Sequence, residues 1–158
     1  MVDDDEVHAQ AMAETGFWGR RGAGCLVYAR STGRFLVALR SDYVQEPGTW
    51  GTWGGAVPEG VDAAASTLRE LAEETGCAEV EAMVPAYVFR DEATGFAYEN
   101  FVAVVEDEFE PVLNWENDGW RWVEQGEWPE PLHFGLDDFL ANVPDLRAAV
   151  AGVAARRA

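Results

Sequence analysis

The stretch from Gly55 to Gly76 limits what this chain can fold into more than any other part of its 158 residues. It begins at the second of two adjacent glycines, Gly54 and Gly55. It continues into a run rich in alanine, leucine and glutamate, which are good helix formers. Asp62 is a favourable N-cap residue, and Gly76 is of the type that commonly follows a last helical turn. The sequence therefore predicts a helix between Asp62 and Gly76 that follows a glycine-rich loop.

This predicted helix has an apolar face and an acidic face. At about 100° per residue, one stripe is expected to face the core. Its members are Ala64, Leu68, Leu71 and Thr75. The opposite face carries Ser66 and three carboxylates, those of Glu70, Glu73 and Glu74. Arg69 lies four residues before Glu73, so we expect the two side chains to form an ion pair.

The clustered carboxylates are unfavourable unless something compensates them. Like charges one turn apart repel, and the C-terminal half of a helix disfavours anions. Hard divalent cations such as Mg²⁺ prefer clustered oxygen ligands, and they assist attack on phosphate esters and anhydrides. A solvated acidic face is the simpler alternative. The glycine-rich loop before the helix and the Arg-Glu-x-x-Glu-Glu-x-Gly ending favour the metal site.

The same segment resembles the signature of the Nudix hydrolase family. That signature runs Gly, five residues, Glu, seven residues, Arg-Glu, an aliphatic residue, any residue, Glu-Glu, any residue, Gly and an aliphatic residue. The matching residues are Gly55, Arg69, Glu70, Leu71, Glu73, Glu74 and Gly76. Val61 replaces the first Glu and Cys77 replaces the last aliphatic residue. Glu59 and Asp62 flank Val61 and are candidates to replace the missing carboxylate.

The resemblance implies an α/β Nudix fold, with a mixed β-sheet sandwiched between α-helices. We expect a flexible acidic N-terminus over residues 1–15 and a single domain over residues 16–158. The remaining pattern of the chain agrees with this architecture. It predicts strands over 24–29, 34–39, 80–90, 96–105 and 120–124, helices over 135–142 and 145–157, and a loop over 41–55.

By resemblance, the box binds Mg²⁺ or Mn²⁺. The implied ligands are the carbonyl of Gly54 and the carboxylates of Glu70, Glu73 and Glu74. Arg69 is expected to position these carboxylates rather than to touch substrate. Glu116, on a later loop, is the first candidate for a further ligand or a general base, with Glu99 and Glu92 behind it.

Three residues of the preceding segment are candidates for substrate binding. By resemblance, Arg40 contacts phosphate, a task that suits a guanidinium. Trp50 and Trp53 are candidates to stack on a base. The alternatives are a surface arginine at a strand end and tryptophans that only pack. His133 is expected to stabilise a turn, and His8 lies in the acidic N-terminal segment.

Charge and cysteine content narrow the class of partner. A net charge of −18 opposes binding to nucleic acid and to an anionic membrane, both of which need basic surface. Cys25 and Cys77 lack metal-ligand spacing and suit a reduced, cytoplasmic protein. No apolar run reaches membrane-spanning length, and the acidic N-terminus is unlike a signal peptide. We expect a small nucleotide as the partner, and the resemblance allows a homodimer.

The sequence thus predicts divalent-metal-dependent hydrolysis of a nucleoside diphosphate linked to another moiety. The substitution at Val61 keeps a second hypothesis open, that of a catalytically impaired Nudix domain acting as a nucleotide-binding or regulatory module. A purely structural acidic domain, which binds neither metal nor nucleotide, is a third hypothesis.

Overall fold

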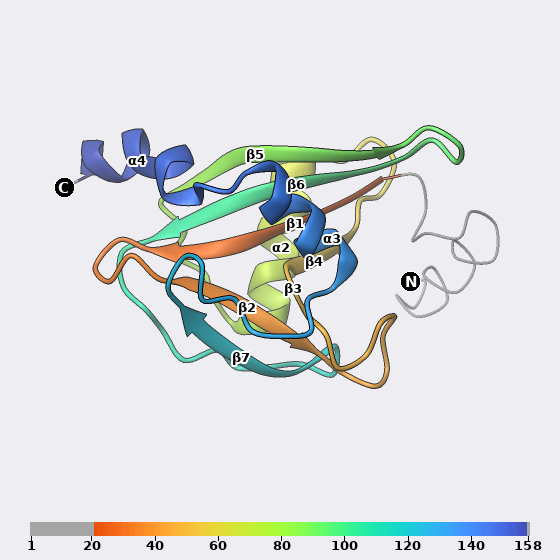
Figure 1. Ribbon diagram of the computed structural model, residues 1–158, viewed down its shortest axis with the longest axis horizontal. Coiled ribbons are helices and arrows are strands. Elements are labelled where there is room, and N and C mark those ends of the chain that lie inside the picture. Colours follow the sequence, from red (N-terminus) through yellow and green to blue (C-terminus); the bar gives the residue numbers. More distant parts are fainter. Residues whose placement is uncertain (1–20, 158) are drawn as a thin grey trace.

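A mixed seven-stranded sheet forms the middle layer of the fold (Figure 1). The computed structural model describes residues 21–157. Its strands are β1 (Arg21–Ala29), β2 (Phe35–Arg40), β3 (Trp50–Gly51), β4 (Trp53–Ala56), β5 (Ala82–Asp91), β6 (Phe96–Val105) and β7 (Asn117–Val123). Its helices are α2 (Ala63–Thr75), α3 (Phe134–Asn142) and α4 (Leu146–Arg157). The predicted flexible segment 1–15, with His8, lies outside the described residues.

Strand β1 has a different partner along each part of one edge. Residues 22–25 pair antiparallel with β4, whereas Val27 and Tyr28 pair antiparallel with β2. The other edge of β1 pairs with β6 over its full length, and this pairing is parallel. β2 also pairs with β3 and β7, and β5 completes the far side of the sheet next to β6.

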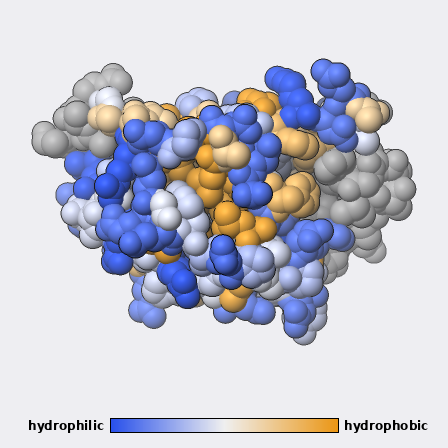
Figure 2. Space-filling view, in the orientation of Figure 1, coloured by the Kyte–Doolittle hydropathy of each residue, from blue (hydrophilic) through white to orange (hydrophobic). Residues whose placement is uncertain are grey.

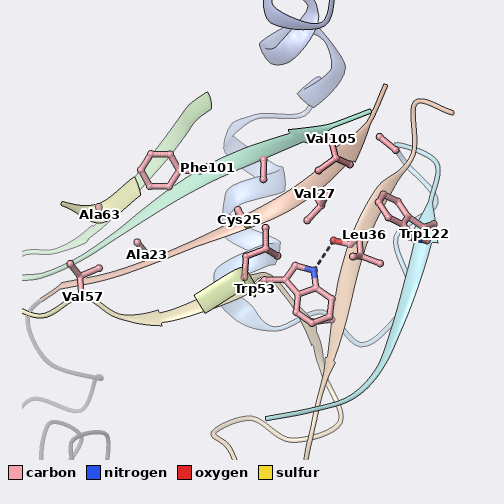
Figure 3. Close-up of a cluster of buried hydrophobic side chains, with 14 residues drawn as sticks. Ala23, Cys25, Val27, Leu36, Trp53, Val57, Ala63, Phe101, Val105 and Trp122 are labelled. Carbon is pink, nitrogen blue, oxygen red and sulfur yellow. Dashed lines mark hydrogen bonds between the residues drawn. The ribbon is translucent and has the colours of Figure 1, made fainter. Parts of the chain in front are cut away.

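Helices cover both faces of the sheet, so the expected layered α/β architecture is confirmed. One core contains Leu71 of α2 together with Cys25 and Trp53 from the sheet (Figure 3). The other core contains Phe139 of α3 and Leu146 of α4. No helix within residues 21–157 is long and apolar enough to span a bilayer.

The predicted limits of the box helix are confirmed. The Asp62 side chain accepts a hydrogen bond from the Ala65 N–H at 2.9 Å, and Gly76 adopts a left-handed conformation with φ of 78°. Elsewhere the predicted strands and helices shift by a few residues at their ends. The loop predicted over 41–55 was only partly right, because β3 and β4 lie within it. These strands are too short for alternation to reveal them.

The predicted core face of α2 was wrong in part. Leu68 is 38% exposed, whereas Glu70 and Glu74 are 7% and 2% exposed. The buried threonines Thr67 and Thr75 are accommodated because each hydroxyl donates to a backbone carbonyl one turn earlier, at 2.8 and 2.7 Å. The helix therefore directs two of its carboxylates into the protein, whereas the periodicity placed them on the face opposite the core.

Candidate metal centre and active site

Three carboxylates from two distant parts of the chain meet at one point. Glu70, Glu74 and Glu116 each offer an oxygen, and these three oxygens lie within 4.8 Å of one another. Glu70 and Glu74 come from successive turns of α2, and Glu116 comes from the loop before β7. Carboxylate oxygens at this spacing form a donor set suited to a hard divalent cation.

Glycines in β4 let the sheet approach these carboxylates closely. A Cβ atom added at Gly55 would lie 3.4 Å from the carboxylate of Glu70. One added at Gly54 would overlap the carbonyl oxygen of Ala23 and the Cα of Gly24 in β1. A larger residue at Gly54 would push β4 away from β1, whereas a Cβ at Gly55 would be in van der Waals contact with the Glu70 carboxylate. The two glycines thus place strand backbone directly against the acidic cluster.

Glu116 is held in place through the backbone of its loop. The N–H of Ser41 donates to the carbonyl of Glu116 at 3.0 Å, and the Ser41 hydroxyl donates to the carbonyl of Trp115 at 2.8 Å. The Asn114 side chain accepts from the Glu116 N–H at 3.0 Å. Ser41 follows β2, so the end of that strand fixes the loop that carries the third carboxylate.

Glu74 is buried beside two other carboxylates, and both conditions raise its pKa. Burial raises its pKa well above the usual range, and the nearby charges of Glu116 and Glu70 raise it further. The Asn117 amide opposes this shift by donating to Oε1 of Glu74 at 3.1 Å. The other oxygen, Oε2, is buried and accepts no hydrogen bond from any residue in 21–157. A bound cation would satisfy that oxygen and offset the repulsion, so the residues present fit a divalent metal ion.

Glu73 does not join this cluster. Its side chain is 46% exposed and accepts a hydrogen bond from Arg69 at 3.0 Å, so the predicted ion pair is present. A second nitrogen of Arg69 donates to Glu70 at 3.2 Å. The arginine therefore touches two box glutamates, in keeping with a positioning role. Glu70 and Glu74 of the predicted set meet Glu116, the further carboxylate singled out from the sequence, whereas the metal-ligand role of Glu73 stays a prediction.

Arg40 borders both the acidic cluster and a cavity. Burial lowers its pKa, while the charges of Glu74 and Glu116 oppose that shift, which places the guanidinium within electrostatic reach of the cluster. Its Nε donates to the carbonyl of Gln45 at 2.6 Å. The arginine is thus partly buried beside the carboxylates, and the alternative of an unconstrained surface residue is excluded.

The cavity next to Arg40 has a volume of about 170 Å³. Aromatic rings supply much of its wall, from Phe89, Phe96, Tyr98 and Phe134. Figure 2 shows apolar surface gathered over α3, the helix to which Phe134 belongs. Among the polar wall residues, Asn100 is buried, whereas Gln45 and Glu46 are exposed. The cavity is therefore apolar inside and polar at its rim.

The two candidate stacking tryptophans have different surroundings. Trp53 is 0% exposed, and its indole N–H donates to the carbonyl of Leu36 at 3.2 Å (Figure 3). The prediction that Trp53 stacks on a base is therefore wrong, since the ring belongs to the core. Trp50 is half-buried, with the guanidinium carbon of Arg121 5.1 Å from its ring centroid. Its predicted role in substrate binding stays a prediction.

The neighbours of Val61 bring no carboxylate to the acidic cluster. Val61 is 38% exposed, and its carbonyl accepts a hydrogen bond from Arg21 at 3.2 Å. Asp62 caps α2 and Glu59 is exposed, and neither belongs to the acidic cluster. The suggestion that they replace the absent side chain as an outer support stays a prediction.

The second-choice carboxylates also lie outside the cluster. Glu99 forms an ion pair with Arg21 at 3.7 Å, and Glu92 is exposed in the turn after β5. His133 caps α3, because its Nδ1 accepts from the Gly135 N–H at 3.0 Å. Burial, aided by Arg40, lowers the pKa of His133 to about 4. The expected turn-stabilising role of His133 is confirmed.

Three polar residues of this region were missed from the sequence. Asn117 supports Glu74, Ser41 supports the Glu116 loop, and Asn100 lies in the cavity wall. The position of Ser41 carries no local signal. An asparagine inside a strand is unusual, so Asn100 was open to detection from the sequence.

Comparisons with known proteins find a matching family model and a relative of similar sequence. A family model described as NUDIX domain matches residues 18–143. A Mycobacterium tuberculosis protein, provisionally named 8-oxo-dGTP diphosphatase 3, is 33% identical over 147 residues, which are 87% of this chain. The chain spans 66% of the length of that relative.

Solved structures show the same architecture. A MutT NUDIX hydrolase from Burkholderia pseudomallei is 26% identical with a TM-score of 0.62, over 78% of this chain and 97% of its own. A Nudix hydrolase from M. smegmatis has a TM-score of 0.68 at 21% identity, over 85% of this chain and 89% of its own. The second likeness concerns the fold alone.

Proposed function

This chain belongs to the Nudix hydrolase family, and on that premise we propose that it hydrolyses a nucleoside diphosphate linked to another moiety, with a divalent metal ion as cofactor. Enzymes of this family act on phosphoric anhydride bonds. The observation that carries the proposal is the buried acidic cluster, in which Oε2 of Glu74 has no hydrogen-bond donor among residues 21–157.

Glu70, Glu74 and Glu116 would hold Mg²⁺ or Mn²⁺, with the carbonyl of Gly54 as a further proposed ligand. A metal ion in this place supplies neutralisation of phosphate charge and a more acidic water. Arg69 keeps the carboxylate of Glu70 oriented through its 3.2 Å hydrogen bond. These groups are held by α2, by β4 and by the loop before β7 that Ser41 anchors, so the site is organised before substrate arrives.

The remaining roles follow from exposure and charge. Glu116 is the least buried member of the cluster and lies on a loop, so we assign it the proton of the attacking water. Arg40 lies within electrostatic reach of the cluster and also lines the adjacent cavity, so it is assigned to the diphosphate. A net charge of −18 repels a nucleotide, which makes this arginine and the metal ion more necessary.

The test is release of phosphate or of a pyrophosphate-linked product from a panel of nucleotides in the presence of Mg²⁺ or Mn²⁺. The panel includes 8-oxo-dGTP, because the M. tuberculosis relative bears that substrate in its name. Glu74→Gln is expected to abolish turnover, and Glu73→Gln to reduce it less, because Glu73 stands outside the cluster. Equal turnover in the wild type and Glu74→Gln would remove the proposed role of the cluster.

A second candidate function is a nucleotide-binding module with impaired turnover. The observation that favours it is Val61, which leaves one box position without a carboxylate, and neither flanking carboxylate joins the acidic cluster. This candidate predicts nucleotide binding with no hydrolysis under either metal ion.

A cytoplasmic location and a homodimer stay predictions. Cys25 and Cys77 are free thiols.

A further inference from the structure

We propose that Asn100 selects the base of the nucleotide by hydrogen bonding to its polar edge inside the aromatic cavity. This inference rests on the proposed function, because it takes the ligand to be a nucleotide. It goes further by naming the residue and the chemical feature that decide which nucleotide is preferred.

Asn100 lies where a bound ring would meet it. The residue is 3% exposed and belongs to β6, where Phe96 and Tyr98 precede it at intervals of two. Alternate residues of a strand share one face, and all three of these line the cavity. The amide is therefore at the inner end of a wall that is otherwise aromatic.

The side-chain amide of Asn100 forms no hydrogen bond with any residue in 21–157, unlike its half-buried polar neighbours in the cavity wall. The hydroxyls of Tyr98 and Thr52 bond to each other at 2.9 Å, and the His133 imidazole accepts from Gly135 at 3.0 Å. The Asn100 amide is not among the fully enclosed unpaired side-chain atoms of residues 21–157, so it is open to the cavity that it lines. A ligand that offers both a donor and an acceptor would satisfy this amide.

The cavity suits a planar ring. Its volume is about 170 Å³, and an apolar cavity of about 150 Å³ is known to accommodate benzene. Phe89, Phe96 and Phe134 supply faces and edges against which a heteroaromatic ring stacks. Aromatic stacking tolerates any base, so discrimination between bases needs a polar group. Asn100 supplies a side-chain amide in the wall of this cavity.

The cavity is connected to the acidic cluster through Arg40. This residue lines the cavity, and it lies within electrostatic reach of Glu74 and Glu116. Gly51 and Thr52 also line the cavity, and β4, which begins at Trp53, leads on to the glycines beside Glu70. A nucleotide with its base against Asn100 would thus direct its phosphates past Arg40 towards the carboxylates.

An asparagine amide presents one donor and one acceptor side by side, which matches a purine edge carrying a neighbouring acceptor and donor. A purine without exocyclic groups lacks one half of that pair. We therefore expect the protein to prefer adenosine or guanosine nucleotides over the corresponding nucleotide of unsubstituted purine. The expected preference is between about 5- and 150-fold, the range for leaving one buried polar group unpaired.

The experiment compares the wild type with Asn100→Leu and Asn100→Asp. The ratio of kcat/KM for the triphosphates of adenosine, guanosine and purine riboside is measured with Mg²⁺. Binding of the three parent nucleosides is measured by calorimetry without metal, since nucleosides carry no phosphate. Asn142→Leu is the matched control, because Asn142 is exposed on α3 and does not line the cavity.

Asn100→Leu is expected to bring the three substrates to within a few-fold of one another, and Asn100→Asp to change which base is preferred. The control keeps the wild-type ratios. Retention of the wild-type ratios in Asn100→Leu overturns the inference, as does a wild type that treats all three bases alike. Should both variants fail to fold, the Asn100 side-chain amide resonance of the wild type decides, since it must shift when the preferred nucleoside binds.

Different results would contradict the role of Asn100 and the proposed function. If turnover depends on Glu74 but the base ratios do not depend on Asn100, only the role of Asn100 falls. If the wild type neither hydrolyses nor binds any nucleotide of the panel, the proposed function falls as well.

Discussion

The amide nitrogen of Asn117 donates a hydrogen bond to Oε1 of Glu74 across 3.1 Å, and both side chains are buried. Asn117 is the first residue of β7, whereas Glu74 lies in the last turn of α2. The bond therefore links the loop that carries Glu116 to the helix that carries Glu70. It also lowers the pKa of Glu74, which burial raises.

We expect Asn117→Ala to weaken the site without removing a ligand. Loss of the donor leaves a second oxygen of Glu74 unpaired, at a cost of roughly 1–3 kcal/mol in the free energy of unfolding. Affinity for Mn²⁺ is expected to fall by about 10- to 100-fold, the usual effect of losing a residue that orients a metal ligand. Urea unfolding and manganese titration measure the two effects. Asn142→Ala, an exposed asparagine of α3, is the control and should change neither.

Glu74→Gln should stabilise the metal-free protein at neutral pH. The substitution removes a buried charge that faces Glu70 and Glu116, and we expect a gain of about 1 kcal/mol or more. Saturating Mg²⁺ should reverse the order, because a ligand at 100 times its Kd stabilises the wild type by about 2.7 kcal/mol. Unfolding curves with a chelator and with Mg²⁺ test this. Glu73→Gln, which loses only an exposed ion pair, should stay within ~0.5 kcal/mol of the wild type in the metal-free state.

Replacing Val61 with Glu tests whether the missing box carboxylate matters. The acidic cluster assembles without this position, and the side chain of Val61 is 38% exposed. We therefore expect stability within ~0.5 kcal/mol of the wild type and turnover changed by less than about tenfold. Steady-state kinetics with the preferred nucleotide provide the measurement. A much larger gain in rate would mean that the natural protein is impaired at this position.

His133 should make the protein less stable in weak acid. Its pKa is about 4 in the folded protein against an ordinary value of 6.5, so the unfolded chain binds the proton more readily between these values. The stabilisation from neutral His133 is present above pH 6.5 and is lost as pH falls towards 4, by up to about 3 kcal/mol. His133→Asn keeps a capping side chain without this titration. Denaturant unfolding of both proteins across the window should show a smaller loss for the variant; equal slopes would refute the assignment.

Trp53→Phe should affect stability and leave substrate recognition unchanged. The change removes the hydrogen bond to the Leu36 carbonyl and leaves space in a fully packed core, at a cost of roughly 1–3 kcal/mol. Because the indole is 0% exposed, KM for nucleotides should be unaffected. Thermal unfolding and initial rates measure both quantities. A raised KM at unchanged stability would restore Trp53 to the substrate site.

Local signals in the sequence were sufficient for the box helix and for the hairpins. Asp62 and Gly76 act on their own neighbours through a side-chain hydrogen bond and a left-handed backbone, so both ends of α2 were predictable. The turn at Asp91–Gly95 was likewise predictable, because Asp91 accepts hydrogen bonds from within the turn itself. Features of this kind depend on residues only a few positions apart.

The composition of the site depended on distant residues and was therefore predicted less well. Periodicity assigned Leu68 to the core and the glutamates to the opposite face, yet Leu68 is 38% exposed, and Glu70 is buried against Gly55 of β4. Glu116 was correctly singled out by resemblance, but its meeting with Glu74 depends on Ser41 and on β2. The position of Asn100 in a cavity wall emerges only once β6 and α3 line the same cavity.

The parallel pairing of β1 with β6 has a consequence for synthesis of the chain. Residues 21–29 find their partner at residues 97–105, so a nascent polypeptide carries its opening strand with one edge unfilled until most of the sequence has left the ribosome. Closing so large a loop costs chain entropy before the paired backbone compensates it, which slows folding. Until β6 has been synthesised, newly made chains would expose the unpaired edge of β1, and a chaperone could bind there.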